Sequence, residues 1–302
     1  MTTTKQISKE QVSQWFQELQ DEICQQLEQE DGKAKFHQDK WSRAEGGGGK
    51  TRIIADGNII EKGGVNYSAV HGAMPEKILT ALNLPNSKFY ATGVSIVIHP
   101  KSPMIPIIHM NIRYFEMDNG TYWFGGGIDL TPHYVFDEDA KFFHQQLKDT
   151  CDKHSDSYYP KFKKWADDYF FIKHRNETRG IGGIFFDRLN DIDGFLKEDR
   201  WEFVKSVGKT FAPTYLELIQ RNENKAFGEP EKKWQMLRRG RYVEFNLVYD
   251  KGTKFGLDTN GRIESILMSL PPVVNWDYNV QPKPGSSEEY TLSVLRKEIS
   301  WI

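Results

Sequence analysis

A run of alternating apolar and polar residues between Ile105 and Phe115 constrains the fold more than any other feature of the sequence. Successive side chains of a β-strand point to opposite faces of a sheet, so this alternation predicts a strand with one face packed on a core. One face would carry Ile108, Met110, Ile112 and Tyr114, and the other would carry His109, Asn111 and Arg113. Faces that only meet water usually carry Lys, Glu and Thr. The polar face is therefore either solvated or, more specifically, the wall of a pocket.

The preceding segment, from Lys88 to His99, repeats this pattern. Ser95 and His99 would share one face of a strand, opposite Val94, Ile96 and Ile98. Prolines at positions 100, 103 and 106 stiffen the connection to the next strand. Two neighbouring strands would then present Ser, His, His, Asn and Arg to one pocket. Arg113 is suited to forked pairing with a carboxylate there.

The remaining patterns predict one α+β domain that spans residues 1–302. Asp56-Gly57, between two β-branched runs, is typical of a hairpin turn. Helices are predicted over residues 8–23, 138–152, 160–178 and 200–221, and further strands over residues 121–124, 241–249 and 262–270. No repeat and no low-complexity linker divides the chain. Strands joined by short turns favour an α-β-α sandwich, with a large, flat, mainly antiparallel sheet covered by helices on both faces.

Composition and charge exclude several classes of protein. No apolar run approaches the roughly 18 residues that a membrane span requires, and the first residues show no secretory signal. The two cysteines, Cys24 and Cys151, suit a reducing compartment, so a cytoplasmic protein is expected. The 40 Lys and Arg residues nearly balance 42 Asp and Glu residues, and the net charge of −2 disfavours a nucleic-acid binder.

The segment Gly46–Gly49, followed by Lys50 and Thr51, partly matches a phosphate-binding loop. Such a loop needs another glycine where this chain has Ala44, and it runs from a strand into a helix. Here a β-branched run follows the glycines instead. The sequence therefore predicts a flexible glycine loop beside a ligand rather than a nucleotide site.

Three further features have both a structural and a functional interpretation. Asp129 follows the triple glycine 125–127 between two apolar residues, and is either a turn former or a functional carboxylate. His144 borders an apolar helical stripe, and is either a packed side chain or part of a site. Basic residues gather over 173–179 and 238–241. They either cap helices and meet solvent, or they bind a small molecule that carries carboxylates or phosphates.

Seven segments between about residues 40 and 275 carry a resemblance to a known family. They read GGGGKTRI, GGVNYSAVHG, HPKSPMIPIIHMNIRYFE, WFGGGIDLTPHY, YPKFKKWADDYFFIKHRNETRGIGGIFFD, LRRGRYVEFNLVYDKGTKFGL and GRIESILMSLPP. With them the chain resembles the oxygen-dependent coproporphyrinogen-III oxidase family of haem biosynthesis, in its bacterial type. The resemblance implies an oxidoreductase that converts the ring A and ring B propionates of coproporphyrinogen III to vinyl groups, giving protoporphyrinogen IX. Molecular oxygen would be the acceptor, and no flavin, haem or nicotinamide is expected.

The same resemblance implies roles for individual residues. His109 would donate a proton, Asp129 would accept pyrrole N–H groups, and Arg113 would hold a propionate for loss of carbon dioxide. The residues implied in substrate binding are Ser95, Asn111, Arg113, Asn260, Gly261 and Arg262. The family's members are homodimers, and the segment from about 242 to 277 resembles their dimer-forming part.

A metal ion is an open question within this resemblance. Bacterial relatives imply a divalent, manganese-like ion on His99, His109, His144 and His174, whereas eukaryotic relatives imply none. Imidazole is a common ligand for such ions. A tight ligand is a poor proton donor, so His109 cannot easily serve both roles, and both possibilities stay open.

Two rival functions remain. A non-haem iron oxygenase would need a carboxylate two residues after a strand histidine, and His109-Met-Asn lacks it. A non-catalytic carrier of tetrapyrroles or other anions would use the same arginines without needing His109 or Asp129.

Overall fold

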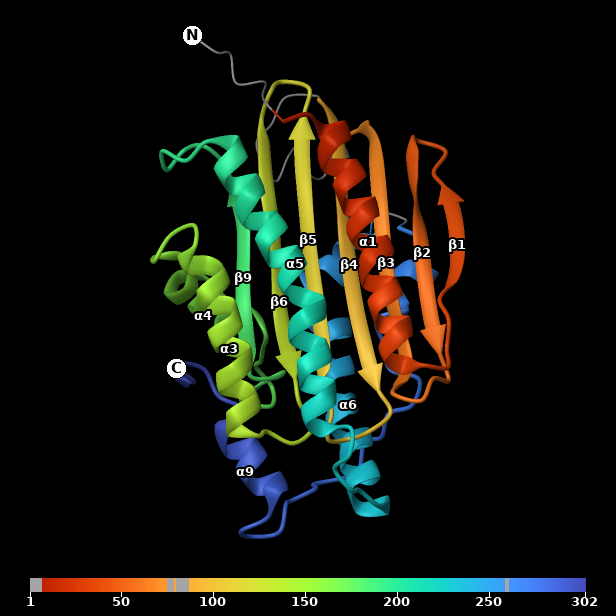
Figure 1. The fold of residues 1–302 in the computed structure, drawn as a ribbon, viewed down its shortest axis with the longest axis vertical. Coiled ribbons are helices and arrows are strands. Elements are labelled where there is room, and N and C mark those ends of the chain that lie inside the picture. Colours follow the sequence, from red (N-terminus) through yellow and green to blue (C-terminus); the bar gives the residue numbers. More distant parts are fainter. Residues whose placement is uncertain (1–6, 75–78, 80–86, 259–260) are drawn as a thin grey trace.

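A seven-stranded sheet in which every neighbouring pair is antiparallel forms the centre of the computed structural model (Figure 1). The structure describes residues 7–74, 79, 87–258 and 261–302. In spatial order the strands are β1 (His37–Ser42), β2 (Gly47–Ala55), β3 (Ile60–Ala73), β4 (Lys88–Pro100), β5 (Ile107–Met117), β6 (Tyr122–Thr131) and β9 (Gly182–Leu189). A separate ribbon pairs β7 (Phe171–Ile172) with β8 (Glu177–Thr178).

Helices lie on both faces of this sheet (Figure 1). The first face is covered by α1 (Lys9–Asp31), α3 (Asp137–Asp152) and α5 (Lys197–Asn222), and α4 (Tyr158–Tyr169) packs along β9. The opposite face carries α6 (Glu229–Val248), α7 (Lys251–Asp258) and α8 (Ile263–Leu267), and α9 (Ser287–Val294) lies near the end of α3. This arrangement confirms the predicted α+β fold with helices on both faces. Over the described part of the chain, no helix is long and apolar enough to cross a membrane.

The first helix begins where the sequence predicts it. The Ser8 hydroxyl accepts a hydrogen bond from the backbone N–H of Gln11, and the Gln11 side chain accepts one from the N–H of Ser8. Gly32 ends the helix in the left-handed region, at φ 70°. Apolar residues that recur at helical spacing, including Val12, Phe16 and Ile23, are buried against the sheet.

The two faces of the sheet differ as the alternation predicts. On β5, Ile108, Met110, Ile112 and Tyr114 are fully buried beneath the helices of the first face. His109, Asn111 and Arg113 point the other way and are partly exposed. We call this second side the polar face; it also carries Ser95 and Asp129, which lie opposite β5 residues in register.

Two predicted strands are helical in the structure, so those predictions are wrong. Residues 241–249 form the end of α6, and residues 262–270 contain α8. The buried side of α6 includes Gln235, Arg238, Arg239, Tyr242 and Asn246. Apolar residues such as Trp234, Leu237 and Phe245 are buried there too, and the buried polar residues between them interrupt the apolar stripe by which hydrophobic periodicity would reveal a helix.

Two other local predictions are also wrong. The helix predicted over 160–178 ends at Tyr169, and the chain then forms the β7–β8 ribbon, whose turn holds Asn176 at φ 55°. Gly47–Gly49 are not a flexible loop but part of β2, paired with β1 and β3. A Cβ at Gly47 would lie 2.2 Å from the carbonyl oxygen of Ala69, so the glycine permits close strand pairing.

Candidate active site

Strand register brings most of the predicted site residues together on the polar face. Ser95 of β4 lies directly opposite Asn111 of β5, and His109 lies opposite Asp129 of β6. Arg113 is two residues beyond Asn111 on the same face, opposite Gly125. The five side chains therefore project from three adjacent strands, and all of them are placed by the central sheet rather than by loops.

His109 is held by a charge-assisted hydrogen bond. Its Nδ1 lies 2.7 Å from Oδ1 of Asp129. An ionised carboxylate can only accept, so Nδ1 carries the hydrogen and the neutral ring leaves Nε2 as its free acceptor nitrogen. The Asp129 side chain is 2% exposed, whereas that of His109 is 22% exposed. The imidazole is thus fixed on its buried side and accessible on the other.

Arg179 occupies the second oxygen of Asp129, at 2.6 Å. Burial raises the pKa of Asp129, but the charges of Arg179 and His109 more than offset it, so the pKa lies below its ordinary value. The guanidinium of Arg179 also donates to Asn246 and is enclosed by aromatic rings. These rings belong to Phe170, Tyr242 and Phe245, with centroids 4.4, 4.7 and 4.8 Å from the guanidinium carbon.

Arg113 is oriented by two neighbours. Its guanidinium donates to Oδ1 of Asn111 and to Oδ1 of Asp187 on β9, both at 2.8 Å. The pair lies over Gly125, where a Cβ would approach the Asp187 oxygen to 2.4 Å and the Arg113 nitrogen to 2.8 Å. This glycine therefore leaves space on the sheet surface for the ion pair. The side chain of Arg113 is 37% exposed and can still reach a ligand.

The predicted substrate residues near the end of the chain, Gly261 and Arg262, lie over the part of the polar face formed by β1 and β2. Asn260 is outside the described residues. Gly261 packs against α7, and its N–H donates to the carbonyl of Gly256 at 2.7 Å. Arg262 begins α8 and pairs with Asp39 on β1. The segment that follows is tied to the sheet by hydrogen bonds from Asn66 to the carbonyl of Ser265 and from Lys62 to that of Leu270.

Comparisons with known proteins show the family to which the chain belongs. A family model described as coproporphyrinogen III oxidase matches residues 11–301. An oxygen-dependent coproporphyrinogen-III oxidase of Drosophila melanogaster is 50% identical over 299 residues, which cover 94% of this chain and 76% of the relative. The chain belongs to the coproporphyrinogen III oxidase family. A Glycine max relative, named as the chloroplastic oxygen-dependent enzyme, is 48% identical over 302 residues, covering 95% of this chain and 78% of its own length.

Family membership confirms the resemblance found in the motifs. It also confirms the predicted enzyme class, an oxidoreductase of the oxygen-dependent coproporphyrinogen-III oxidase type, for which oxygen is the co-substrate. Family membership alone does not identify which residues of this chain carry the activity.

The structure does not gather the four histidines considered as metal ligands for this family member. His99 is buried, and its Nε2 bonds to the carbonyl of Ser269. His144 is equally buried between the Tyr159 hydroxyl and the Ile181 carbonyl. Burial lowers the pKa of each of these two imidazoles to about 3.

His174 lies in the β7–β8 turn, where it contacts Tyr249 and Glu244, and His109 contacts Asp129. Over the described residues, no three His, Cys, Asp or Glu side chains form a group that could hold a metal ion. The residues present do not fit a shared metal ion, and we derive no step through one.

The basic clusters that suggested an anion site in this oxidase are mostly internal ion pairs. Arg238 pairs with Glu177, and Arg239 pairs with Glu61. Both arginines are at most 4% exposed, so they hold α6 on the β7–β8 ribbon and on the central sheet and are not available to a ligand. Arg175 forms two hydrogen bonds with Glu244.

Sequence reasoning missed three residues of the oxidase site. Arg179 was grouped with its basic neighbours, and Asp187 and Asp39 were not singled out at all. Each lies far along the chain from its partner: Arg179 is 50 residues from Asp129, and Asp187 is 74 residues from Arg113. No local spacing in the sequence links Asp39 or Asp187 to an arginine.

Proposed function

We propose that this chain converts two propionates of coproporphyrinogen III to vinyl groups, with His109, Asp129 and Arg113 as the residues that act on the substrate. In each step one propionate loses carbon dioxide, one proton and two electrons. Oxygen takes the two electrons and two protons and becomes hydrogen peroxide, so one further proton comes from the protein or solvent. The observation that carries the proposal is the accessible imidazole of His109, which the buried carboxylate of Asp129 holds in place. On β5, His109 lies two positions from Asn111 and four positions from Arg113.

His109 would move a proton through Nε2. Its Nδ1–H is engaged by Asp129, which fixes the tautomer and the orientation of the ring. An imidazole is the side chain best suited to proton transfer near neutral pH. An electron-rich, deprotonated pyrrole would supply the electrons to oxygen directly.

Asp129 would orient His109 rather than bind the pyrrole nitrogens. The sequence predicted direct acceptance of pyrrole N–H groups. Both oxygens of this buried carboxylate are already engaged, by His109 and by Arg179. The arrangement therefore supports an orienting role, with Arg179 keeping the carboxylate ionised.

Substrate carboxylates would bind the exposed arginines of the polar face. Arg113 offers a guanidinium over β5 and β6, and Arg262 offers another over β1 and β2. The side chains of Ser95 and Asn111 lie in register beside Arg113 and would add hydrogen bonds. Bidentate pairing with a carboxylate is the geometry for which Arg is best suited.

The decisive experiment is turnover of coproporphyrinogen III in air by purified, chelator-treated protein, compared with manganese-supplemented protein. We expect equal rates, because the candidate histidines have separate protein partners and do not meet. Product is measured as protoporphyrin fluorescence after chemical oxidation. Turnover only with added metal would contradict the expectation. Tetrapyrrole binding without turnover in either sample would favour the carrier.

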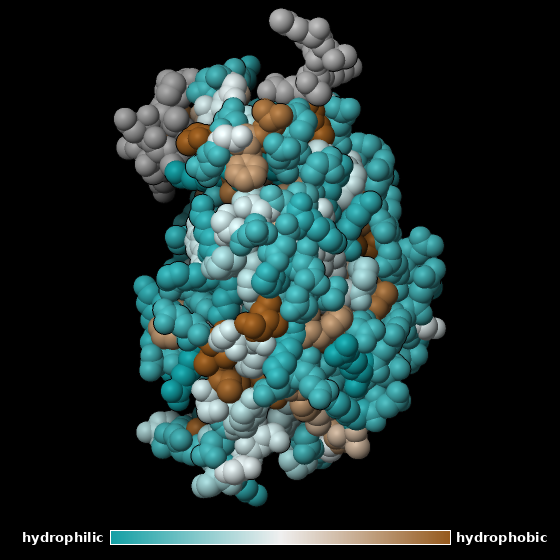
Figure 2. Space-filling model, turned by 60° about the vertical axis from the view of Figure 1, so that its left-hand side comes forward, coloured by the Kyte–Doolittle hydropathy of each residue, from teal (hydrophilic) through white to brown (hydrophobic). Residues whose placement is uncertain are grey.

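We also propose that the chain forms a homodimer through part of the 242–277 segment. Apolar side chains exposed by 41–58% gather there: Leu247, Val248, Leu257, Ile263, Val273 and Trp276. The side of the molecule around α3 and α4, in contrast, is mostly hydrophilic (Figure 2). Exposed apolar groups concentrated in this way indicate a protein interface. Residues 242–246 are largely buried inside the subunit, so the contact would begin after them.

The dimer is tested by replacing Ile263 with Asp, which would place a charge in the proposed contact. We expect the mass measured by light scattering to fall from two chains toward one, because burying an unpaired carboxylate is costly. Ile192→Asp, at an exposed isoleucine outside the segment, is the matched control. A wild-type protein that has the mass of one chain would contradict the proposal.

A reducing, cytoplasmic location is proposed from the cysteines. Cys24 and Cys151 are both free and buried. Cell fractionation with an antibody against the chain tests this, and recovery in an organelle, as the name of the Glycine max relative indicates for that protein, would contradict it.

A further inference from the structure

Both arginines that face the substrate region already hold a carboxylate of this chain. Arg113 pairs with Asp187 at 2.8 Å, and Arg262 pairs with Asp39. All four side chains are partly exposed, at 37 and 31% for the first pair and 28 and 40% for the second. Neither pair is therefore a buried structural ion pair of the kind that Arg179 and Asp129 form.

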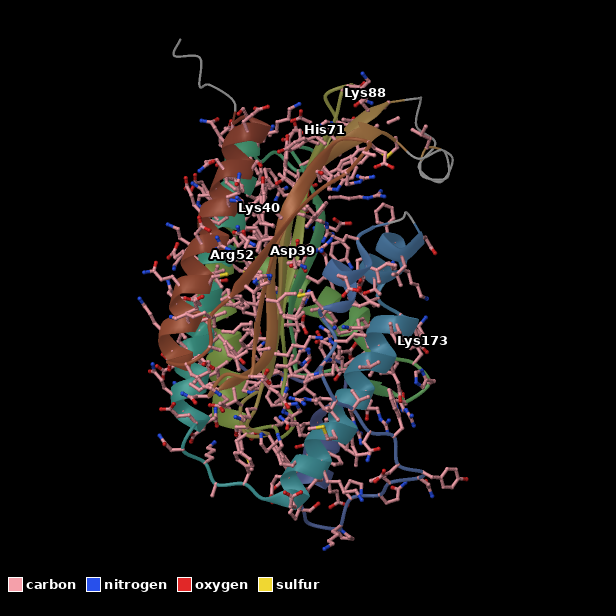
Figure 3. The ribbon with its side chains drawn as sticks, turned by 90° about the vertical axis from the view of Figure 1, so that its right-hand side faces the viewer. Asp39, Lys40, Arg52, His71, Lys88 and Lys173 are labelled. Carbon is pink, nitrogen blue, oxygen red and sulfur yellow. The ribbon has the colours of Figure 1, made fainter. Side chains whose placement is uncertain are left out.

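The two pairs lie at opposite sides of the polar face. One continuous row of strand partners runs from Asp39 through Thr51, Asn66 and Ser95 to Asn111. Asp39 and Asn111 are separated by four strand spacings, roughly 19 Å. The side chains between them are uncharged. Figure 3 shows Asp39 on the side of the sheet that faces α7 and α8, opposite the side where Arg52 meets α1.

Each pair is held in place by its surroundings. Asn111 accepts a hydrogen bond from Arg113, and the absence of a side chain at Gly125 leaves room for Asp187 beside it. Arg262 also donates to the Ser265 hydroxyl at 3.1 Å. The guanidinium groups are thus directed before any ligand arrives.

The carboxylate of an aspartate and that of a propionate are the same chemical group, so they compete for one guanidinium. A substrate with four carboxylates would place negative charges directly beside those of Asp39 and Asp187, and adjacent like charges repel. Binding therefore requires the aspartates to move away from the arginines.

We propose that Asp39 and Asp187 are resident carboxylates, which orient Arg262 and Arg113 in the free enzyme and are exchanged for substrate propionates on binding. The inference rests on the proposed function and deepens it. Both aspartates are positioning residues, since they act through the arginines. Because two exchanges are needed, a ligand with too few carboxylates to reach both arginines is bound less tightly than a tetracarboxylate.

The test measures binding of coproporphyrin III, the oxidised and unreactive form with four propionates, by quenching of protein fluorescence. Asp187→Asn and Asp39→Asn each remove one competitor while keeping a side chain of the same shape. We expect each variant to lower Kd about two- to fivefold, the range of partly exposed ion pairs. The double variant should show the product of the two factors, because the sites are far apart. The gain should shrink at high salt.

A second ligand and a second readout separate exchange from a purely structural role. Protoporphyrin IX has only two propionates, so its Kd should improve less in the double variant than that of coproporphyrin III. In turnover of coproporphyrinogen III, Asp187→Asn should lower KM more than it changes kcat, because Asp187 has already left Arg113 in the enzyme–substrate complex. Loss of structure would instead weaken binding of both porphyrins.

Asp21→Asn is the matched control, since Asp21 pairs with Arg52 at 2.6 Å on the opposite face of the sheet. It should leave Kd unchanged. Unchanged or weaker binding in Asp39→Asn and Asp187→Asn, with wild-type thermal unfolding, would overturn the proposal. If the wild-type chain binds coproporphyrin III but does not convert coproporphyrinogen III, the proposed function fails while the exchange is still tested by Kd.

Discussion

Replacing Asp129 with Asn should reduce kcat by about 10²–10⁴-fold, because the carboxylate that fixes the tautomer and orientation of His109 is lost. The amide has nearly the shape of the carboxylate, so it can still contact His109 and Arg179. It carries no charge, however, and its NH₂ group can only donate. Arg179, enclosed by Phe170, Tyr242 and Phe245, is then left without its counter-charge.

The measurement is single-turnover conversion of coproporphyrinogen III over a range of pH. The rate of the variant is compared with that of the wild-type chain at each pH. Asp167→Asn is a useful control, because Asp167 is also a buried carboxylate paired with a basic residue, Lys163, but belongs to α4. A variant of Asp129 that turns over at more than a tenth of the wild-type rate would refute the role given to this carboxylate.

Replacing Arg179 with Met should destabilise the fold by about 3–5 kcal/mol, the usual cost of removing one partner from a buried ion pair. Asp129 would remain buried beside His109 alone, and Asn246 would lose its donor. A chain of this size loses about 2 °C in Tm for each kcal/mol, so thermal unfolding should begin roughly 6–10 °C lower. Arg175→Met removes an arginine that is 38% exposed, and its partner Glu244 keeps Arg241 and His174, so the change should cost less than about 1 kcal/mol.

The contribution of Asp129 to the pH dependence of folding stability should have opposite signs in the wild-type chain and in Arg179→Met. In the wild-type chain the pKa of Asp129 is below its ordinary value, so its stabilising contribution is present above pH 4 or so and is lost as acid protonates the folded state. Without Arg179, burial raises this pKa instead, and the folded state takes up a proton more readily than the unfolded chain. The difference in Tm between variant and wild type should therefore narrow between pH 7 and pH 5. A difference that is constant with pH would show that Asp129 is not the group left unpaired.

Local patterns sufficed where burial follows hydrophobic periodicity. The alternation from His109 to Tyr114 correctly predicted which side chains enter the core, because a strand in a half-covered sheet must bury every second residue. The capping box at Ser8 correctly placed the start of α1. Periodicity failed at α6, where buried arginines interrupt the apolar stripe. In the sequence, a charged residue that is buried cannot be distinguished from one on the surface unless its partner is known.

The candidate site likewise has residues that the sequence identified and contacts that only the structure shows. His109, Asn111 and Arg113 were identified from a single strand, because three side chains of one strand share a face whatever surrounds them. Asp129 was also singled out, but its pairing with His109 and Arg179, and that of Asp187 with Arg113, were not, since these contacts depend on strand register and tertiary packing. The metal site on four histidines was left open by the sequence, and the described residues do not bring those histidines into one group.

For this protein, the sequence by itself determined the fold class, the two faces of the sheet and the family, because long motifs and strand alternation are local properties of the chain. Only the tertiary structure decided which charges are available to a substrate. Arg179, Arg238 and Arg239 are enclosed with acids of their own, whereas Arg113 and Arg262 keep partly exposed, exchangeable partners. The physical reason is that a charge acquires its role from burial and from the distance to its nearest counter-charge, and residues far apart in sequence set both.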